Sequence, residues 1–143
     1  MHFNLPNALA DLALQSLADL SKINSHRLNL AQYYFSKINN PEVKVIYSQN
    51  NSNSNIYLRF VILAKNRQAL WRYFRNHKII LGNWYDRVIS PKNVDLAKAG
   101  YALGDCPKAE LAASQTLNLP NHLAISLNDA DKVIKLLNEY HGD

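Results

Sequence analysis

The chain has 143 residues and a formal net charge of +5, from 16 Lys and Arg against 11 Asp and Glu. This length suffices for one domain with its own hydrophobic core, and 48% hydrophobic with 19% charged residues is typical of a folded soluble protein. The single cysteine excludes an internal disulfide framework and a four-cysteine zinc site. No segment has the roughly 18 consecutive apolar residues of a membrane span, and the N-terminus lacks the pattern of an export signal. We therefore expect a single cytoplasmic domain over residues 1–143, with no membrane insertion.

The first predicted element is a long helix. From Pro6 to about Asn39, apolar residues recur at helical spacing without an interior Pro or Gly. Unbroken, this helix would be roughly 50 Å long, whereas a compact chain of this size has a radius of gyration of about 14 to 15 Å. We therefore expect either a kink near Ser21–Ser25 or an N-terminal half that packs against a partner outside this chain.

Three strands and a second helix are predicted next. Val43–Tyr47 and Ile56–Leu63 have the composition of strands, and the polar residues between them favour a hairpin. Asn66 is a suitable N-cap for a helix from Arg67 to about His77. Ile79–Leu81 is apolar and is followed by a glycine, so we expect a third strand there.

The C-terminal part is predicted to hold two helices after a long loop. The first begins near Cys106–Pro107 and ends near Thr116, and Leu117–Leu119 is expected to be extended. Ser126–Asp129 is a variant of the capping box and predicts the start of the last helix. Together these elements predict an α+β fold, a small three-stranded and mainly antiparallel sheet covered by helices, with a long N-terminal helix.

The residues best suited to chemistry or recognition lie between Gly82 and His122. The four glycines of the chain form no phosphate-binding loop, and its five histidines form no metal-binding pair. Cys106 stands at a predicted helix N-terminus, but no His or acid has a recognisable spacing to it, which favours a small buried or capping residue over a nucleophile. Trp84 and Tyr85 follow a predicted strand, and they either line a cleft or cap the core.

Four short motifs occur in the order and at the spacing of one known family: Gly82–Tyr85, Cys106–Glu110, Leu119–His122 and Ser126–Asp129. In these motifs the chain resembles the C-terminal domain of DegT-type sugar aminotransferases, which are fold type I enzymes that use pyridoxal phosphate (PLP). Pro6–Ala10 is similar to the start of the family's long helix, which joins its two domains. The resemblance covers nearly all 143 residues.

The resemblance implies a large N-terminal domain that holds PLP and the Schiff-base lysine, a nucleotide-sugar or similar small-molecule substrate, and a homo-oligomer in the full-length form. Tyr85 falls on the family's tyrosine near the substrate pocket, and Trp84 replaces the family's histidine, so both are expected on the wall of that pocket. Asn4 lies where the family has an Asn-Tyr-Arg-like run that contacts a cofactor phosphate. None of the lysines here matches the catalytic one, so we expect no catalytic residue in this chain and no PLP bound to it alone.

Two other functions remain open from the residues themselves. Between Glu42 and Asp86 there is no acid, and the basic and aromatic residues of Lys44–Lys78 are compatible with a nucleic-acid-binding module. The same basic residues lie at helix-face spacing and can equally be a solvated surface. The overhanging first helix is compatible with a structural or assembly domain.

Overall fold

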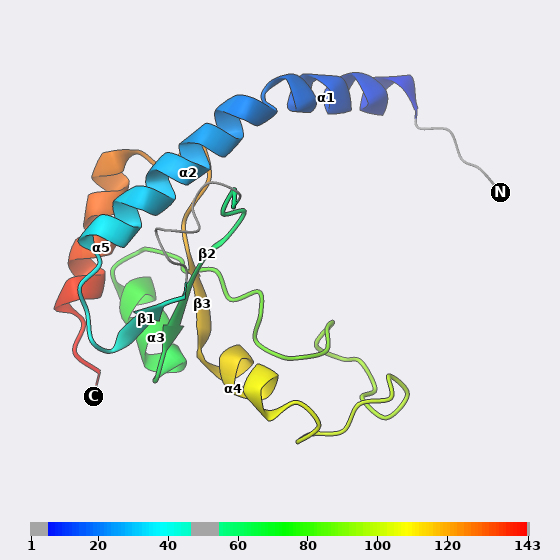
Figure 1. Cartoon of the computed structure of the whole chain (residues 1–143), viewed down its shortest axis with the longest axis vertical. Helices are drawn as coiled ribbons and strands as arrows, with labels where there is room; N and C mark the ends of the chain where they lie inside the picture. The colour runs from blue at the N-terminus through cyan, green and yellow to red at the C-terminus, as the bar shows by residue number, and fades with distance from the viewer. Residues whose placement is uncertain (1–5, 47–54, 143) are drawn as a thin grey trace.

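A computed structural model of the chain describes residues 6–46 and 55–142 (Figure 1). Asn4 lies outside these ranges, as do most of the polar residues expected to connect the hairpin strands. The elements follow in the order α1 (Asn7–Ala18), α2 (Leu20–Lys37), β1 (Val43–Val45), β2 (Phe60–Ala64), α3 (Arg67–Asn76), α4 (Pro107–Gln115), β3 (Thr116–Leu119) and α5 (Leu127–Glu139). The predicted α+β class is confirmed.

The long N-terminal helix is divided into α1 and α2 at Asp19. This residue, with φ −82° and ψ −6°, separates the two helices, so the predicted kink exists but lies two residues before Ser21. Figure 1 shows α1 projecting beyond the rest of the molecule. None of its residues is buried, and its four leucines are 50 to 64% exposed: Leu9, Leu12, Leu14 and Leu17. The helix α1 therefore contributes nothing to the core of this chain.

The sheet has three antiparallel strands in the order β1-β2-β3. The predicted pairing of the first two strands is confirmed, with Val43 opposite Ala64. Strand β2 also pairs with β3, and Ile62 lies opposite Leu117. The central strand β2 is thus hydrogen-bonded on both edges, and four of its five residues are buried.

The prediction that Ile79–Leu81 is the third strand is wrong, because β3 takes that role. Only Gly82 pairs with β3, through two hydrogen bonds with the backbone of Asn118 of 2.8 and 2.9 Å. Leu81 is buried, whereas Ile80 is 78% exposed. The segment therefore has the alternating burial of a strand but makes only one bridge of the ladder.

The hydrophobic core lies on one face of the sheet, beneath α2, α3 and α5 (Figure 1). Side chains alternate between the faces of a strand, so Phe60 and Ile62 of β2 point to this face together with Leu117 of β3. The ring of Tyr34 from α2 lies 5.0 Å from that of Phe60. Further core residues come from the helices: Leu30, Ala31, Leu70, Phe74, Ala130, Val133, Ile134 and Leu137.

Two predicted helix caps are present. The side chain of Asn66 accepts a hydrogen bond from the backbone N–H of Ala69 at 3.1 Å, at the start of α3. Ser126 and Asp129 form the expected capping box at the start of α5, each accepting a hydrogen bond from the other's backbone N–H. These caps satisfy N–H groups that a helix leaves without partners, and they fix where both helices begin.

Candidate functional site

The long connection from Gly82 to α4 is anchored at its beginning. The bridge between Gly82 and Asn118 holds it to β3, and Arg67 at the start of α3 donates a hydrogen bond to the side chain of Asn83 at 2.8 Å. Trp84 and Tyr85 follow directly and are 63% and 52% exposed. They therefore do not cap the core of the described structure, and the pocket-wall role expected of them stays a prediction.

Trp84 lines a cavity of about 530 Å³ beside the edge of β3, here called the tryptophan cavity. The guanidinium of Arg59 stacks on the Trp84 ring, with its carbon 5.0 Å from the ring centre. Trp71 of α3 lines the same cavity, so both tryptophans of the chain meet there. The polar side chains of its wall come from two arginines, three asparagines and one histidine: Arg27, Arg59, Asn83, Asn118, Asn121 and His122.

Tyr85 lines a different hollow of about 390 Å³, together with Tyr57, Val61 and Thr116. Arg59 borders both this hollow and the tryptophan cavity. Among the described residues, the two aromatic side chains predicted for the site are therefore neighbours that face separate spaces, with Arg59 between them.

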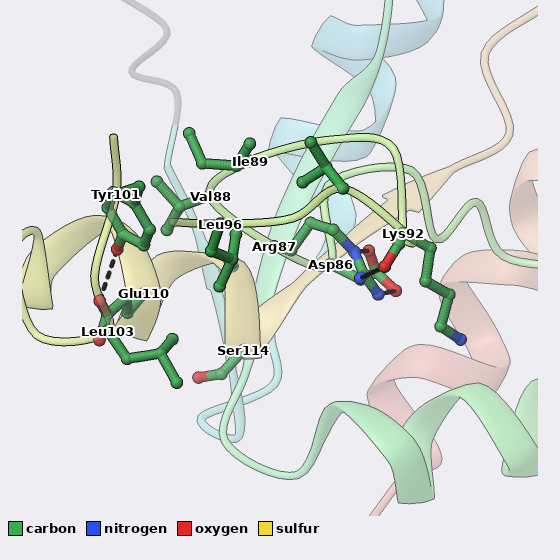
Figure 2. Close-up of a pocket in the computed structure, with 12 residues that line it drawn as sticks. Asp86, Arg87, Val88, Ile89, Lys92, Leu96, Tyr101, Leu103, Glu110 and Ser114 are labelled. Carbon is green, nitrogen blue, oxygen red and sulfur yellow. Dashed lines mark hydrogen bonds and ion pairs between the residues drawn. The ribbon is translucent and has the colours of Figure 1, made fainter. Parts of the chain in front are cut away.

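A third cavity, of about 400 Å³, lies between the long connection and α4 (Figure 2). At one end the guanidinium of Arg87 binds the Asp86 carboxylate through two hydrogen bonds of 2.8 and 3.0 Å, and it also donates to the carbonyl of Lys92. The hydrogen bonds from Arg87 lower the pKa of Asp86, and this carboxylate raises the pKa of the guanidinium. Asp86 and Arg87 are therefore both ionised at neutral pH, and their opposite charges cancel.

The other end of this cavity is closed by Glu110 of α4. Its carboxylate accepts hydrogen bonds from the Tyr101 hydroxyl and from the backbone N–H of Gly104 at 2.7 Å. The Tyr101 hydroxyl lowers the pKa of Glu110, with the Gly104 N–H adding to the effect, and the same bond raises the pKa of Tyr101 to about 12. Both carboxylates of this cavity are thus held by hydrogen bonds from residues of the long connection.

Other candidate chemistry is not assembled in the described part of the chain. The expectation of a buried or capping cysteine is wrong, because Cys106 is exposed at the N-cap of α4 and its side chain makes no capping hydrogen bond. No group of three or more His, Cys, Asp or Glu residues that could hold a metal ion occurs within residues 6–46 and 55–142. No helix in these ranges is long and apolar enough to cross a membrane.

The described residues do not fit a complete PLP site. A lysine that forms a Schiff base is activated by desolvation or by a neighbouring cation. All ten lysine side chains of this chain lie at exposed positions. No step through PLP can therefore be derived from these residues alone.

The fold is that of a part of known aminotransferases. An aminotransferase from Brucella abortus superimposes with a TM-score of 0.72 at 27% identity, over 91% of this chain and 34% of the other. DesV from S. venezuelae, solved in complex with a ketimine intermediate, gives a TM-score of 0.72 at 25% identity, over 86% of this chain and 33% of the other. Spr1654 from Streptococcus pneumoniae in its PLP form reaches 0.77 at 16% identity, over 94% of this chain and 35% of the other, which is a likeness of fold alone.

The sequence assigns the family directly. The model of the DegT/DnrJ/EryC1/StrS aminotransferase family matches residues 1–138, and the chain belongs to this family. It spans about a third of the length of the solved relatives. No curated protein matches the sequence.

Proposed function

We propose that this chain is the small C-terminal domain of a PLP-dependent sugar aminotransferase. It contributes Trp84 and Tyr85 to one wall of the substrate pocket, and a large domain on the same or a separate chain supplies the Schiff-base lysine. The assembled enzyme is a cytoplasmic homo-oligomer that acts on a nucleotide-sugar or similar small molecule. When bound in the large domain, PLP supplies the carbonyl chemistry that transfers an amino group.

The proposal rests on the shares of the two chains that the structural match covers. Relatives at 25 to 27% identity cover 86 to 91% of this chain but only 33 to 34% of their own. The match thus corresponds to one domain of a larger enzyme. The exposed leucines of α1 support the proposal that another part of the enzyme packs against this helix. Burying one leucine side chain would stabilise the assembled protein by about 1.5 to 3 kcal/mol.

In this proposal Trp84 and Tyr85 contact the substrate and orient it. Trp84 and Tyr85 stand at the anchored start of the long connection and offer flat apolar surfaces with polar edges. Such surfaces orient a sugar ring and exclude water from it when a second domain closes the pocket. Neither side chain needs to exchange a proton for this role.

The nucleic-acid alternative loses its main support in the structure. Tyr57, Phe60 and Phe74, three of the aromatic residues interleaved with the basic span, are buried to at least 98%. Base stacking requires exposed aromatic faces. The basic side chains on α3 therefore fit a solvated helix face better than a nucleic-acid surface.

A chimera tests the proposed role. This chain would replace the matching third of the Brucella abortus aminotransferase, and the conversion of bound PLP to its amino form would be followed with a panel of amino acid donors. We expect a folded chimera that binds PLP and turns over. Changing Tyr85 to Ala should raise KM or lower kcat at least tenfold without destabilising the domain, because the side chain is half exposed.

Leu111→Ala serves as the control, since Leu111 of α4 is 58% exposed and lines neither the cavity of Trp84 nor the hollow of Tyr85. It should leave turnover unchanged. A folded chimera that binds no PLP would refute the domain assignment. Full activity in both the Tyr85→Ala and the Trp84→Ala chimeras would refute the pocket-wall role.

A further inference from the structure

Arg67 is the first residue of α3, and the helix itself gives no reason for an arginine there. The first turn of α3 contains no acid that could pair with it. A cation at a helix N-terminus meets the positive end of the helix dipole, which is unfavourable. Arg67 is nevertheless partly buried, whereas Arg72 and Arg75 of the same helix are exposed. The contacts that favour an arginine at this position must therefore lie outside α3.

The Arg67 guanidinium contacts both ends of the long connection. Its Nη1 donates to Oδ1 of Asn83 at 2.8 Å and, at the longer distance of 3.5 Å, to the carbonyl of Ala113. Ala113 lies in the last turn of α4, where carbonyls lack helical partners and the dipole favours a cation. The hydrogen bonds from Arg87 are the main cause of the lowered pKa of Asp86, and the charge of Arg67 adds to their effect. One side chain thus holds the start of the connection against the end of the helix that follows it.

This contact precedes the aromatic pair Trp84 and Tyr85 directly. Both side chains are more than half exposed, so packing gives them little orientation. Their direction depends on how the backbone leaves Asn83, and for Trp84 also on the stacking of Arg59. Residues that orient a substrate have to be held within about 0.5 Å of their productive positions. If Asn83 were released from α3, the aromatic pair would no longer be held to this precision.

We propose that Arg67 is a positioning residue of the substrate pocket, which ties Asn83 to the end of α4 and so fixes the place of the aromatic pair. The inference rests on the proposed function, since it requires Trp84 and Tyr85 to form a pocket wall. Arg67 has no contact with substrate or cofactor in this role and exchanges no proton. Its loss should therefore weaken the use of the substrate and leave the binding of PLP unchanged.

The mobility of Trp84 in the chain alone tests the positioning. With Trp71→Phe as the background, Trp84 is the only tryptophan, and time-resolved fluorescence anisotropy reports the fast local motion of its indole. Arg67→Gln and Asn83→Ala should each raise the amplitude of this motion about twofold. The double variant should show no further rise, because both substitutions remove the same hydrogen bond. Asn83→Asp should keep the parent value, since a carboxylate accepts the same bond from a guanidinium.

Arg72→Gln is the matched control, because the Arg72 side chain binds the carbonyl of Gln68 in its own helix. It should leave the motion of Trp84 unchanged. Circular dichroism checks that each variant is folded, and Asn83 is exposed, so its substitution leaves the core intact. Equal motion in the parent and in both single variants, or fully additive effects in the double variant, would overturn the proposal.

The chimera with the Brucella abortus enzyme tests the consequence for the substrate. With the amino acid donor that converts bound PLP fastest, Arg67→Gln should lower kcat/KM about threefold or more at an unchanged Kd for PLP. In a chimera that already carries Trp84→Ala and Tyr85→Ala, it should have no further effect, because Arg67 acts through these two residues. An equal loss with and without the aromatic pair would contradict the positioning role. A chimera that binds no PLP refutes the domain assignment, whereas unchanged motion of Trp84 in the chain alone refutes the role of Arg67 and leaves that assignment intact.

Discussion

The substitution Gly82→Ala probes the point where the candidate site is attached to the sheet. A Cβ at this position would lie 3.1 Å from the Cβ of Asn118, and 3.2 and 3.3 Å from two atoms of the Trp84 indole. All three distances are shorter than ordinary van der Waals contact, so both neighbours have to move by a few tenths of an ångström. The indole of Trp84 is 63% exposed and can move, whereas Asn118 is buried and hydrogen-bonded in β3 and resists the shift.

Two opposing effects set the size of the change in stability. Overpacking costs typically about 1 to 3 kcal/mol, and the free indole together with the buried Asn118 places this site near the middle of that range, at about 2 kcal/mol. Replacing Gly by Ala also stabilises by about 0.4 to 1 kcal/mol through the unfolded chain, where the backbone conformation allows it. We therefore expect a net loss of about 1 to 1.5 kcal/mol for Gly82→Ala.

Urea unfolding followed by circular dichroism would measure this loss of stability. The tryptophan fluorescence of the native state would show whether the Trp84 indole has moved away from Arg59. Gly142→Ala is the control, because its Cβ would meet no atom closer than 3.6 Å. It should cause no loss of stability and no spectral change. If Gly82→Ala were as stable as the parent with unchanged emission, the close approach of Trp84 to the bridge would be wrong.

Three further predictions concern the exposed helix, the last cap and the core. The double substitution Leu12→Ser and Leu17→Ser should lower the free energy of unfolding of the isolated chain by less than about 0.5 kcal/mol, because no residue of α1 is buried. A larger loss, measured by urea unfolding, would show that α1 packs on the domain. The hydrogen bond from Ser126 lowers the pKa of Asp129 from 3.8 to about 2. The stability that the ionised carboxylate contributes is therefore present above about pH 4 and is lost as the pH falls towards about 2. Asp129→Asn should flatten the pH dependence of Tm in that range, and an unchanged slope would contradict this. Tyr34→Phe should cost about 1 to 3 kcal/mol, because it leaves the carbonyl after β3 without its 2.9 Å hydrogen bond. Burial raises the pKa of the Tyr34 hydroxyl above its usual 10, with a nearby carboxylate adding to the effect, so the parent should lose stability as pH rises through 10 and the variant should lose less.

Local signals in the sequence were enough to predict most helices. Asn66 and the capping box at Ser126–Asp129 act within one helical turn, so the residues that decide the structure are adjacent in the sequence. The pairing of β1 with β2 was predicted because the two strands follow one another in the sequence with a polar segment between them. The break at Asp19 was placed two residues too late because no Pro or Gly marks it.

The third strand was assigned to the wrong segment because strand pairing is decided over long distances. Ile79–Leu81 has the stronger strand composition, and Thr116–Leu119 contains Asn118, a residue that strands disfavour. The buried Asn118 is tolerated because its backbone and its side-chain amide both bind Gly82, 36 residues earlier. A pattern read along the chain does not contain that contact.

The candidate site was predicted only in part. Trp84 and Tyr85 were singled out by their position after Gly82, and the structure places them at the surface there. Arg59 had a usable signal, since it is the only charge in the apolar segment Ile56–Leu63, yet its stacking on Trp84 joins residues far apart in the chain. Arg27 lies on a helix with many polar neighbours, and nothing in the sequence distinguishes it as a site residue.

The most direct test of the proposed function asks where the Schiff-base lysine resides. The purified chain would be incubated with PLP, reduced with borohydride, digested and mapped by mass spectrometry. If the lysine belongs to a separate large domain, the adducts should be substoichiometric and spread over the exposed lysines. A single stoichiometric adduct on one lysine of this chain would contradict the proposal.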